Sequence, residues 1–250
     1  MKYKCAYMTL ATTPFYLEGA RHLYETYQAA KCKYPFYIMV LNTTDTTGYE
    51  DLPLIKVMTI KPKNPDHWWY NGGTTIKKSK YNVDIFNKFN LLLMSEYDYI
   101  MFLDADCLFR RNADKLMDEC AQSLIYGNKD MVAAEINYNS RNYYASAPTE
   151  YRINGAKPKH TLNADWMFFK TSLSLFYQVL KYMENSEDEE IMLYNMWYDN
   201  VLTLAWPGTT RIYDYINHNL PPINGDKYTK YWETPEGMSQ FNQILKELKR

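Results

Sequence analysis

Residues 99–109 read Tyr-Ile-Met-Phe-Leu-Asp-Ala-Asp-Cys-Leu-Phe, an apolar run that ends at two carboxylates, Asp104 and Asp106. The run Ile100–Leu103 has no polar face, which predicts a strand covered on both sides within an α/β sheet. Ligands bind such sheets where the strands end. Two carboxylates this close repel each other, and a divalent cation relieves the repulsion while leaving coordination positions for phosphate oxygens. The segment therefore predicts a metal-bridged phosphate site, and the alternative is a pair of solvated loop residues.

The composition narrows the class of protein. A chain of 250 residues without a Gly-, Ser- or Pro-rich linker predicts one α/β domain. Its 28 basic and 29 acidic residues nearly balance, which argues against nucleic acid or an anionic membrane as the partner. We find no apolar run of about eighteen residues and no signal-peptide core, and so expect no integral membrane segment.

The same features predict a cytoplasmic location, with peripheral association to membranes left open. The four cysteines lie far apart without metal-site spacing, which predicts reduced, mostly buried thiols. Residue usage rich in Lys, Asn, Tyr and Ile is compatible with an AT-rich bacterial or large-virus genome.

Hydrophobic periodicity predicts a strand–helix–strand unit near the start of the chain. The run Cys5–Leu10 is strand-like, and Thr12-Thr13-Pro14 then supplies a polar turn whose proline suits the first turn of a helix. Apolar residues at three- and four-residue intervals predict that helix over residues 16–30, and the run 36–41 predicts the second strand. The crossover between the strands should be right-handed.

The rest of the chain continues to alternate strands and helices. We expect further strands at 54–60, 131–135 and 166–169 and helices at 84–96, 114–126, 173–183 and 238–250. The acidic run 187–190 is interpreted as capping or solvating the helix after it. Residues 61–79 predict a long irregular loop of the kind that is commonly functional.

Several segments, taken in order, resemble glycosyltransferase family 8, the glycogenin-like and bacterial galactosyltransferase-like enzymes that use a nucleotide-sugar donor. They are Met8–Ala20, Lys88 at sixteen residues before Asp104, and Leu103-Asp104-Ala105-Asp106. The resemblance implies a single GT-A domain, a Rossmann-like nucleotide-diphospho-sugar transferase fold with a central mixed, mostly parallel sheet flanked by helices. The nucleotide-binding part would span about residues 1–110, the acceptor-side part about 111–235, and a C-terminal helix 236–250.

The resemblance also implies a donor and metal site. The residues carried over as UDP-sugar contacts are Leu10, Thr12, Thr13, Tyr16, Lys88, Asp104 and Ala105, with Lys227 and Lys230 competing for the pyrophosphate. Asp104 and Asp106 correspond to the family's ligands for Mn²⁺, with Mg²⁺ as the alternative metal. His218 corresponds to the third ligand, although the Lys-Pro-Trp that follows in the family is absent here.

Two further segments carry the implied catalytic residues. Asn163-Ala164-Asp165 resembles a family segment that normally ends in glycine, so that Asp165 brings a charge to a position usually kept small. Asp199-Asn200 resembles the family's Asp-Gln pair, whose acidic residue lies near the reacting sugar carbon. Asn163, Asp165, Asp199 and Asn200 are thus the catalytic candidates, and the sequence does not decide between Asp165 and Asp199 as the supporting carboxylate.

The function implied is a metal-dependent retaining glycosyltransferase that moves a hexose from a UDP-sugar to a carbohydrate, protein-glycan or other hydroxyl acceptor. A sugar nucleotidyltransferase is one alternative, but the turn Thr12-Thr13-Pro14 lacks its Gly-rich basic loop. A non-catalytic glycan-binding module using Trp68, Trp69 and Tyr70 is the other. The donor sugar, the acceptor and a homodimeric state are left open.

Overall fold

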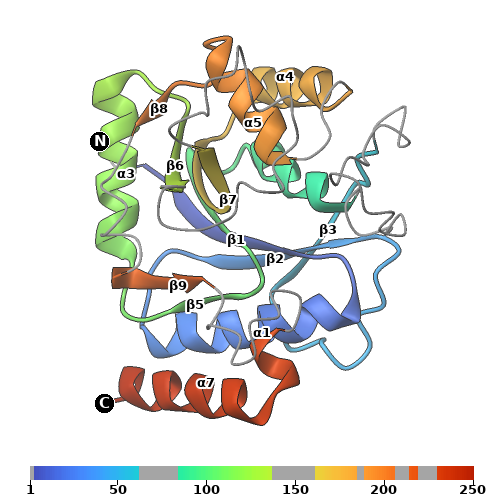
Figure 1. Ribbon diagram of the computed structural model, residues 1–250, viewed down its shortest axis with the longest axis vertical. Coiled ribbons are helices and arrows are strands. Elements are labelled where there is room, and N and C mark those ends of the chain that lie inside the picture. The colour runs from blue at the N-terminus through green and yellow to red at the C-terminus, as the bar shows by residue number, and fades with distance from the viewer. Residues whose placement is uncertain (1–2, 62–83, 137–160, 185–188, 206–213, 219–229) are drawn as a thin grey trace, which may run out of the picture.

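The computed structural model of the chain describes residues 3–61, 84–136, 161–184, 189–205, 214–218 and 230–250. Within these residues a seven-stranded sheet runs in the order β3-β2-β1-β4-β7-β6-β8 (Figure 1). Its strands are β1 Cys5–Ala11, β2 Phe36–Leu41, β3 Leu54–Val57, β4 Tyr99–Leu103, β6 Met131–Ile136, β7 Thr161–Lys170 and β8 Leu204–Ala205. A two-stranded ladder joins β5 Cys107–Phe109 to β9 Ile216–His218.

The sheet is mixed and mostly parallel, as predicted. Strands β3, β2, β1 and β4 pair in parallel, so their carboxyl ends meet at one edge. Strand β7 runs antiparallel to both β4 and β6, and β8 is parallel to β6. The expected strand–helix–strand unit is β1, α1 Pro14–Ala29 and β2.

Helices cover both faces of the sheet (Figure 1). One face carries α1 and α3 Asp114–Gly127; the other carries the 3₁₀ helix η2 Ile85–Leu93, α4 Leu173–Met183 and α5 Glu189–Tyr198. Strand β4 shows why its sequence has no polar side: Met101 and Leu103 enter the core under α1, while Ile100 and Phe102 enter the opposite core. A C-terminal pair, η7 Tyr231–Glu233 and α7 Pro235–Leu248, packs outside α1.

Helix starts follow local capping chemistry. The Thr13 hydroxyl accepts from the Tyr16 amide and Pro14 takes the first helical position, so α1 begins two residues before the predicted residue 16. The Thr234 hydroxyl accepts from the Gly237 amide and starts α7 at Pro235 rather than at 236 or 238. None of the helices in the described ranges is both long and apolar enough to cross a bilayer.

The segment 84–96 differs from its prediction because it is a 3₁₀ helix rather than an α-helix. The Asn87 and Asn90 amides donate to backbone carbonyls three residues earlier, at 2.9 and 3.0 Å, and so compete with α-helical bonding. Asn87 also accepts from the Ile60 amide at 2.6 Å, and Asn90 donates to the Met58 carbonyl at 2.9 Å. These buried amides fix η2 to the segment that follows β3.

Strand boundaries also differ from the prediction. Strand β3 ends at Val57 instead of residue 60, and β7 begins at Thr161, well before the expected residue 166. Between β6 and β7 the register jumps, with Ala133 opposite Met167 but Ala134 opposite Asn163. Three residues, Ala164–Trp166, are therefore left without a partner on β6, which is a bulge of the kind that redirects side chains beside active sites.

We expect Gly19→Ala to lower the free energy of unfolding by about 1–3 kcal/mol. A Cβ at Gly19 would lie 2.6 Å from the Trp232 ring and 2.7 Å from the Ala105 carbonyl oxygen, both in packed surroundings. Urea denaturation followed by tryptophan fluorescence measures the effect. Gln28→Ala, on the exposed side of the same helix, is the matched control and should change stability little. Equal stability of both variants and the wild type would show that Trp232 does not pack against α1.

Candidate active site

The two carboxylates of the Asp-x-Asp segment lie in the turn between β4 and β5. The Cys107 amide donates to the Asp104 carbonyl at 2.9 Å and closes this turn, and the Asp104 amide donates to the Asp165 carbonyl at 2.8 Å. Because β1 and β4 are parallel neighbours, the turn that follows β1 lies at the same edge of the sheet. Candidate residues from the turn after β1 and from the turn after β4 thus share one location.

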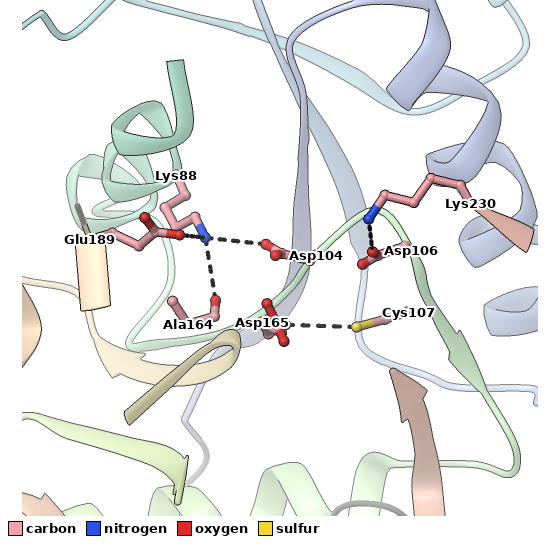
Figure 2. Close-up of polar contacts among 8 residues, drawn as sticks. All are labelled: Lys88, Asp104, Asp106, Cys107, Ala164, Asp165, Glu189 and Lys230. Carbon is pink, nitrogen blue, oxygen red and sulfur yellow. Dashed lines mark hydrogen bonds and ion pairs between the residues drawn. The ribbon is translucent and has the colours of Figure 1, made fainter. Parts of the chain in front are cut away.

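Lys88 projects from η2 into this edge and is only 2% exposed. Its Nζ lies 3.2 Å from Asp104 Oδ1, 3.5 Å from Glu189 Oε1 and 3.4 Å from the Ala164 carbonyl oxygen (Figure 2). The ammonium also sits 5.0 Å from the centre of the Phe102 ring. Four separate elements therefore converge on one buried cation.

The charges around Lys88 keep it protonated. Burial by itself would lower the pKa of the Lys88 amine, because a low-dielectric surrounding disfavours the charged form. The Asp104, Glu189 and Asp165 carboxylates outweigh burial and raise that pKa above its ordinary value. Lys88 therefore offers a fixed positive charge at neutral pH.

A second lysine holds the other carboxylate. Lys230, immediately before η7, places its Nζ 2.5 Å from Asp106 Oδ2 (Figure 2). Burial acts to lower the pKa of the Lys230 amine, but Asp106 and, less strongly, Tyr16 raise it overall. Of the two lysines proposed for the pyrophosphate, the structure brings Lys230 to the site, and Lys227 lies outside the described residues.

Aromatic packing fixes the backbone that carries Lys230. The Trp232 ring lies against Gly19 and within 5.3 Å of the Phe15 ring, measured between centroids. Phe15 in turn contacts Tyr16 edge to face at 5.4 Å. Gly19 has no side chain where α1 approaches both Trp232 and the Ala105 carbonyl, and this permits the close contact.

The predicted nucleoside contacts gather at the same edge. Leu10 is on β1, Thr13 caps α1, and Tyr16 adds to the raised pKa of the Lys230 amine. The Thr12 carbonyl accepts from the Thr44 hydroxyl at 3.1 Å, which ties this turn to the loop after β2. Their contact with a nucleotide stays a prediction.

The third predicted metal ligand lies near the carboxylates along the backbone. His218 stands opposite Cys107 in the antiparallel β5–β9 ladder, and Cys107 directly follows Asp106 in the chain. The side chains of His218 and Asn163 are outside the described residues, as are Trp68, Trp69 and Tyr70. Among the side chains that are described, no three His, Cys, Asp or Glu form a metal-ligating group.

Asp199 and Asn200 are not brought to this cluster. They follow the last residue of α5, where Asp199 is exposed and accepts from the Tyr182 hydroxyl at 2.6 Å. Asn200, with φ of 60°, takes the left-handed conformation that commonly ends helices. A helix of 10 residues is about 15 Å long. Asp199 therefore lies at the opposite end of α5 from the Lys88 cluster.

Glu189 occupies the near end of α5 and is a site residue that the sequence does not reveal. The acidic run that contains it predicts a cap or a solvated helix face, yet the Glu189 side chain is 16% exposed and pairs with Lys88. A pattern of successive acidic residues does not reveal which of them turns inward. The only signal available was the position of the run directly before an apolar helix.

No protein-family model and no curated protein sequence matches this chain. Solved structures do match. The galactosyltransferase LgtC, in complex with donor and acceptor sugar analogues, has a TM-score of 0.60 at 11% identity, covering 98% of this chain and 96% of LgtC. GlyE of Streptococcus pneumoniae has a TM-score of 0.53 at 10% identity, over 98% of this chain and 62% of GlyE. The bifunctional glycosyltransferase WbbM has a TM-score of 0.53 at 12% identity, over 99% of this chain and 45% of WbbM.

The chain has the fold of these glycosyltransferases. This match confirms the predicted GT-A α/β class, with the mixed sheet and the helices on both faces described above. An active-site glutamine-to-glutamate mutant of LgtC has a TM-score of 0.59 at 13% identity, over 96% of this chain and 94% of that one. At such identities the GT-A likeness describes architecture alone.

We expect Lys88→Met to lower the free energy of unfolding by about 1–3 kcal/mol, because it leaves the half-buried Asp104 and Glu189 carboxylates near each other without their shared cation. Urea denaturation at pH 7 gives the value. Adding Glu189→Gln to Lys88→Met removes one of the stranded charges and should recover part of the loss. If the double variant is as unstable as the sum of the two single variants, Lys88 and Glu189 are not coupled.

Proposed function

We propose that this protein is a metal-dependent retaining glycosyltransferase that transfers a hexose from a UDP-sugar to a hydroxyl of a carbohydrate or protein-glycan acceptor. The observation that carries the proposal is the Asp104-Ala105-Asp106 turn at the edge of a GT-A sheet, with a lysine paired to each carboxylate, Lys88 buried and Lys230 half-buried. The family 8 resemblance of the first strand and of this turn supports it. So does the likeness to LgtC, whose structure was solved with donor and acceptor sugar analogues.

The residues present suit a divalent metal. Asp104 and Asp106 supply hard carboxylate oxygens. His218 lies across the β5–β9 ladder from Cys107, the residue that follows Asp106. We propose that these three residues hold Mn²⁺, or Mg²⁺ as the alternative, since Mn²⁺ accepts imidazole together with carboxylates. When bound, the metal would neutralise charge on the diphosphate of the donor.

The two lysines are placed to stabilise the leaving group. Departure of the nucleoside diphosphate from the sugar develops negative charge on its terminal phosphate, and fixed cations nearby stabilise that charge as it forms. Lys88 and Lys230 both stay protonated, and their carboxylate partners fix their positions. They need little reorganisation to act, which is the source of the catalytic advantage.

We propose Glu189, together with Asp165, as the carboxylates that support the reacting sugar carbon. Glu189 contacts Lys88, and Asp165 adds to the raised pKa of the Lys88 amine, which supports a role for both beside this lysine, whereas Asp199 is at the far end of α5. Loss of the diphosphate leaves positive charge on the anomeric carbon, which a nearby carboxylate stabilises or attacks. Either course gives retention, by a front-face route or by a covalent intermediate.

We expect Glu189→Gln to reduce the rate of UDP release from donor hydrolysis by about 10²-fold or more, because it removes a negative charge that stabilises the developing cation. Asp199→Asn is the matched control, and we expect it to stay within about threefold of wild type, since an exposed surface substitution is usually mild. Initial rates with Mn²⁺ and excess donor give both values. A large loss in Asp199→Asn with none in Glu189→Gln would return the role to Asp199.

We expect UDP to bind only when Mn²⁺ is present, and Asp106→Asn to weaken that binding by about tenfold or more through loss of a charged metal ligand. Isothermal titration of UDP with Mn²⁺, and then with excess chelator, measures both effects. Asp51→Asn removes an exposed carboxylate outside this turn and is the control. UDP binding that survives the chelator would overturn the metal assignment, and sugar binding without UDP binding would favour a glycan-binding module.

A further inference from the structure

We propose that Asn87 and Asn90 are positioning residues of the donor site, because they hold η2 in the 3₁₀ form that directs Lys88 to Asp104. The inference rests on the proposed function, in which Lys88 stabilises the departing diphosphate. Neither asparagine contacts the donor, and both act through Lys88. Three observations carry it: the length of η2, the spacing of its buried side chains and the hydrogen bonds of the two amides.

Helix η2 is longer than a 3₁₀ helix usually becomes. It spans nine residues, whereas 3₁₀ helices seldom continue beyond three or four, because their hydrogen-bond geometry is poorer than that of an α-helix. The nine residues include no proline or glycine, so their sequence does not exclude the α-helical form. Contacts from outside η2 are therefore needed to keep it as a 3₁₀ helix.

The side chains of η2 form three stripes, because residues three apart lie above one another in a 3₁₀ helix. One stripe is apolar and fully buried in a single core, and it consists of Phe86, Phe89 and Leu92. The second stripe contains Asn87 and Asn90, and the third contains Lys88. In an α-helix each residue turns by about 100° instead of about 120°, so the ends of the apolar stripe would separate by about 120°. Only the 3₁₀ form buries the whole apolar stripe while Lys88 faces the donor site.

The asparagine stripe binds the segment that follows β3. Asn87 and Asn90 are 0% and 2% exposed. The Asn87 side-chain oxygen accepts from the Ile60 amide at 2.6 Å. The Asn90 side-chain amide donates to the Met58 carbonyl at 2.9 Å. Both side-chain amides also donate to backbone carbonyls three residues earlier, at 2.9 and 3.0 Å. Each asparagine thus joins a 3₁₀ turn to residues outside the helix.

These bonds determine where the Lys88 ammonium lies relative to the sheet. Strand β3 belongs to the parallel set β3, β2, β1 and β4, so the segment after it lies at the edge where ligands bind. Lys88 directly follows Asn87, and its Nζ lies 3.2 Å from Asp104 and 3.5 Å from Glu189 (Figure 2). A rotation of η2 about its axis would move the ammonium away from both carboxylates. Functional groups need placement within about 0.5 Å, and the two asparagines supply it here.

The test is a double-mutant cycle on the dissociation constant of UDP, measured by isothermal titration with Mn²⁺ present. UDP is the leaving group itself, so its affinity reports its contact with Lys88. We expect Asn90→Ala to weaken UDP binding by about threefold or more in the wild type, and to change it little when Lys88→Met is already present. The fitted stoichiometry gives the folded fraction, so unfolding is not mistaken for weaker binding.

Two further variants separate positioning from stability. Asn90→Ser keeps a hydroxyl that can donate to the Asn87 carbonyl but is too short to reach the Met58 carbonyl. It should also weaken UDP binding, and it replaces Asn90→Ala in the cycle if that variant does not fold. Thr171→Val is the control, because it removes a hydroxyl bond to the Tyr97 carbonyl at the amino end of β4. We expect it to lower stability without changing the affinity for UDP.

The possible results distinguish the positioning role from the proposed function. No UDP binding by the wild type would contradict the proposed function. UDP binding that Lys88→Met does not weaken would remove Lys88 from the leaving group, and the positioning role with it. If Lys88→Met weakens binding but both Asn90 variants bind like the wild type, the positioning role alone is overturned. An equal loss from Asn90→Ala with and without Lys88 would also overturn it, because the asparagine would then not act through the lysine.

Discussion

A single buried cation organises the centre of this molecule. Placing an ammonium such as Lys88 out of water costs several kcal/mol unless oppositely charged and polar groups surround it. The groups that do so come from the β4–β5 turn, the bulge of β7 and the first turn of α5, while η2 supplies the lysine. Each of these segments must therefore take its place for the charge to be stable. The requirement joins segments up to 101 residues apart in the chain.

The second carboxylate of the same turn makes an equivalent connection on the other side of the sheet. Asp106 binds Lys230, and Trp232 packs the same short segment against α1 at Gly19. The pair η7–α7 is thereby attached to the site as well as to the core. Two carboxylates of one turn thus connect both helical layers to the edge of the sheet where ligands bind.

The charged groups at the end of β4 bear on function as well as on stability. Buried carboxylates and ammonium groups contribute less to stability than well-packed apolar side chains of the same volume. Their presence at the end of β4, rather than in the two apolar cores, is the expected pattern for a site that binds a charged ligand. The fold supports many chemistries, so the assignment of glycosyl transfer depends on these particular groups and not on the architecture alone.

Local sequence determined much of the structure. The run before Asp104 predicted β4, because each of its residues is apolar and enters one of two cores. Thr13 and Pro14 predicted the start of α1 within two residues, since capping depends only on near neighbours. Lys88 and Asp104 were both predicted as donor-site residues, from family resemblance rather than from periodicity, and the structure brings their side chains together.

Only the tertiary structure decided which distant residues complete the site. Glu189 looked like one of several solvated acids, and Lys230 looked no better than Lys227, because neither pattern shows which side chain turns inward. The bulge that presents Asp165 arises from pairing with β6, a strand about thirty residues away, and no local propensity predicts such a shift. Composition and periodicity determined the layers and the first carboxylates. The partners of those carboxylates were set by long-range packing, since burying one charge requires an opposite charge wherever in the chain it occurs.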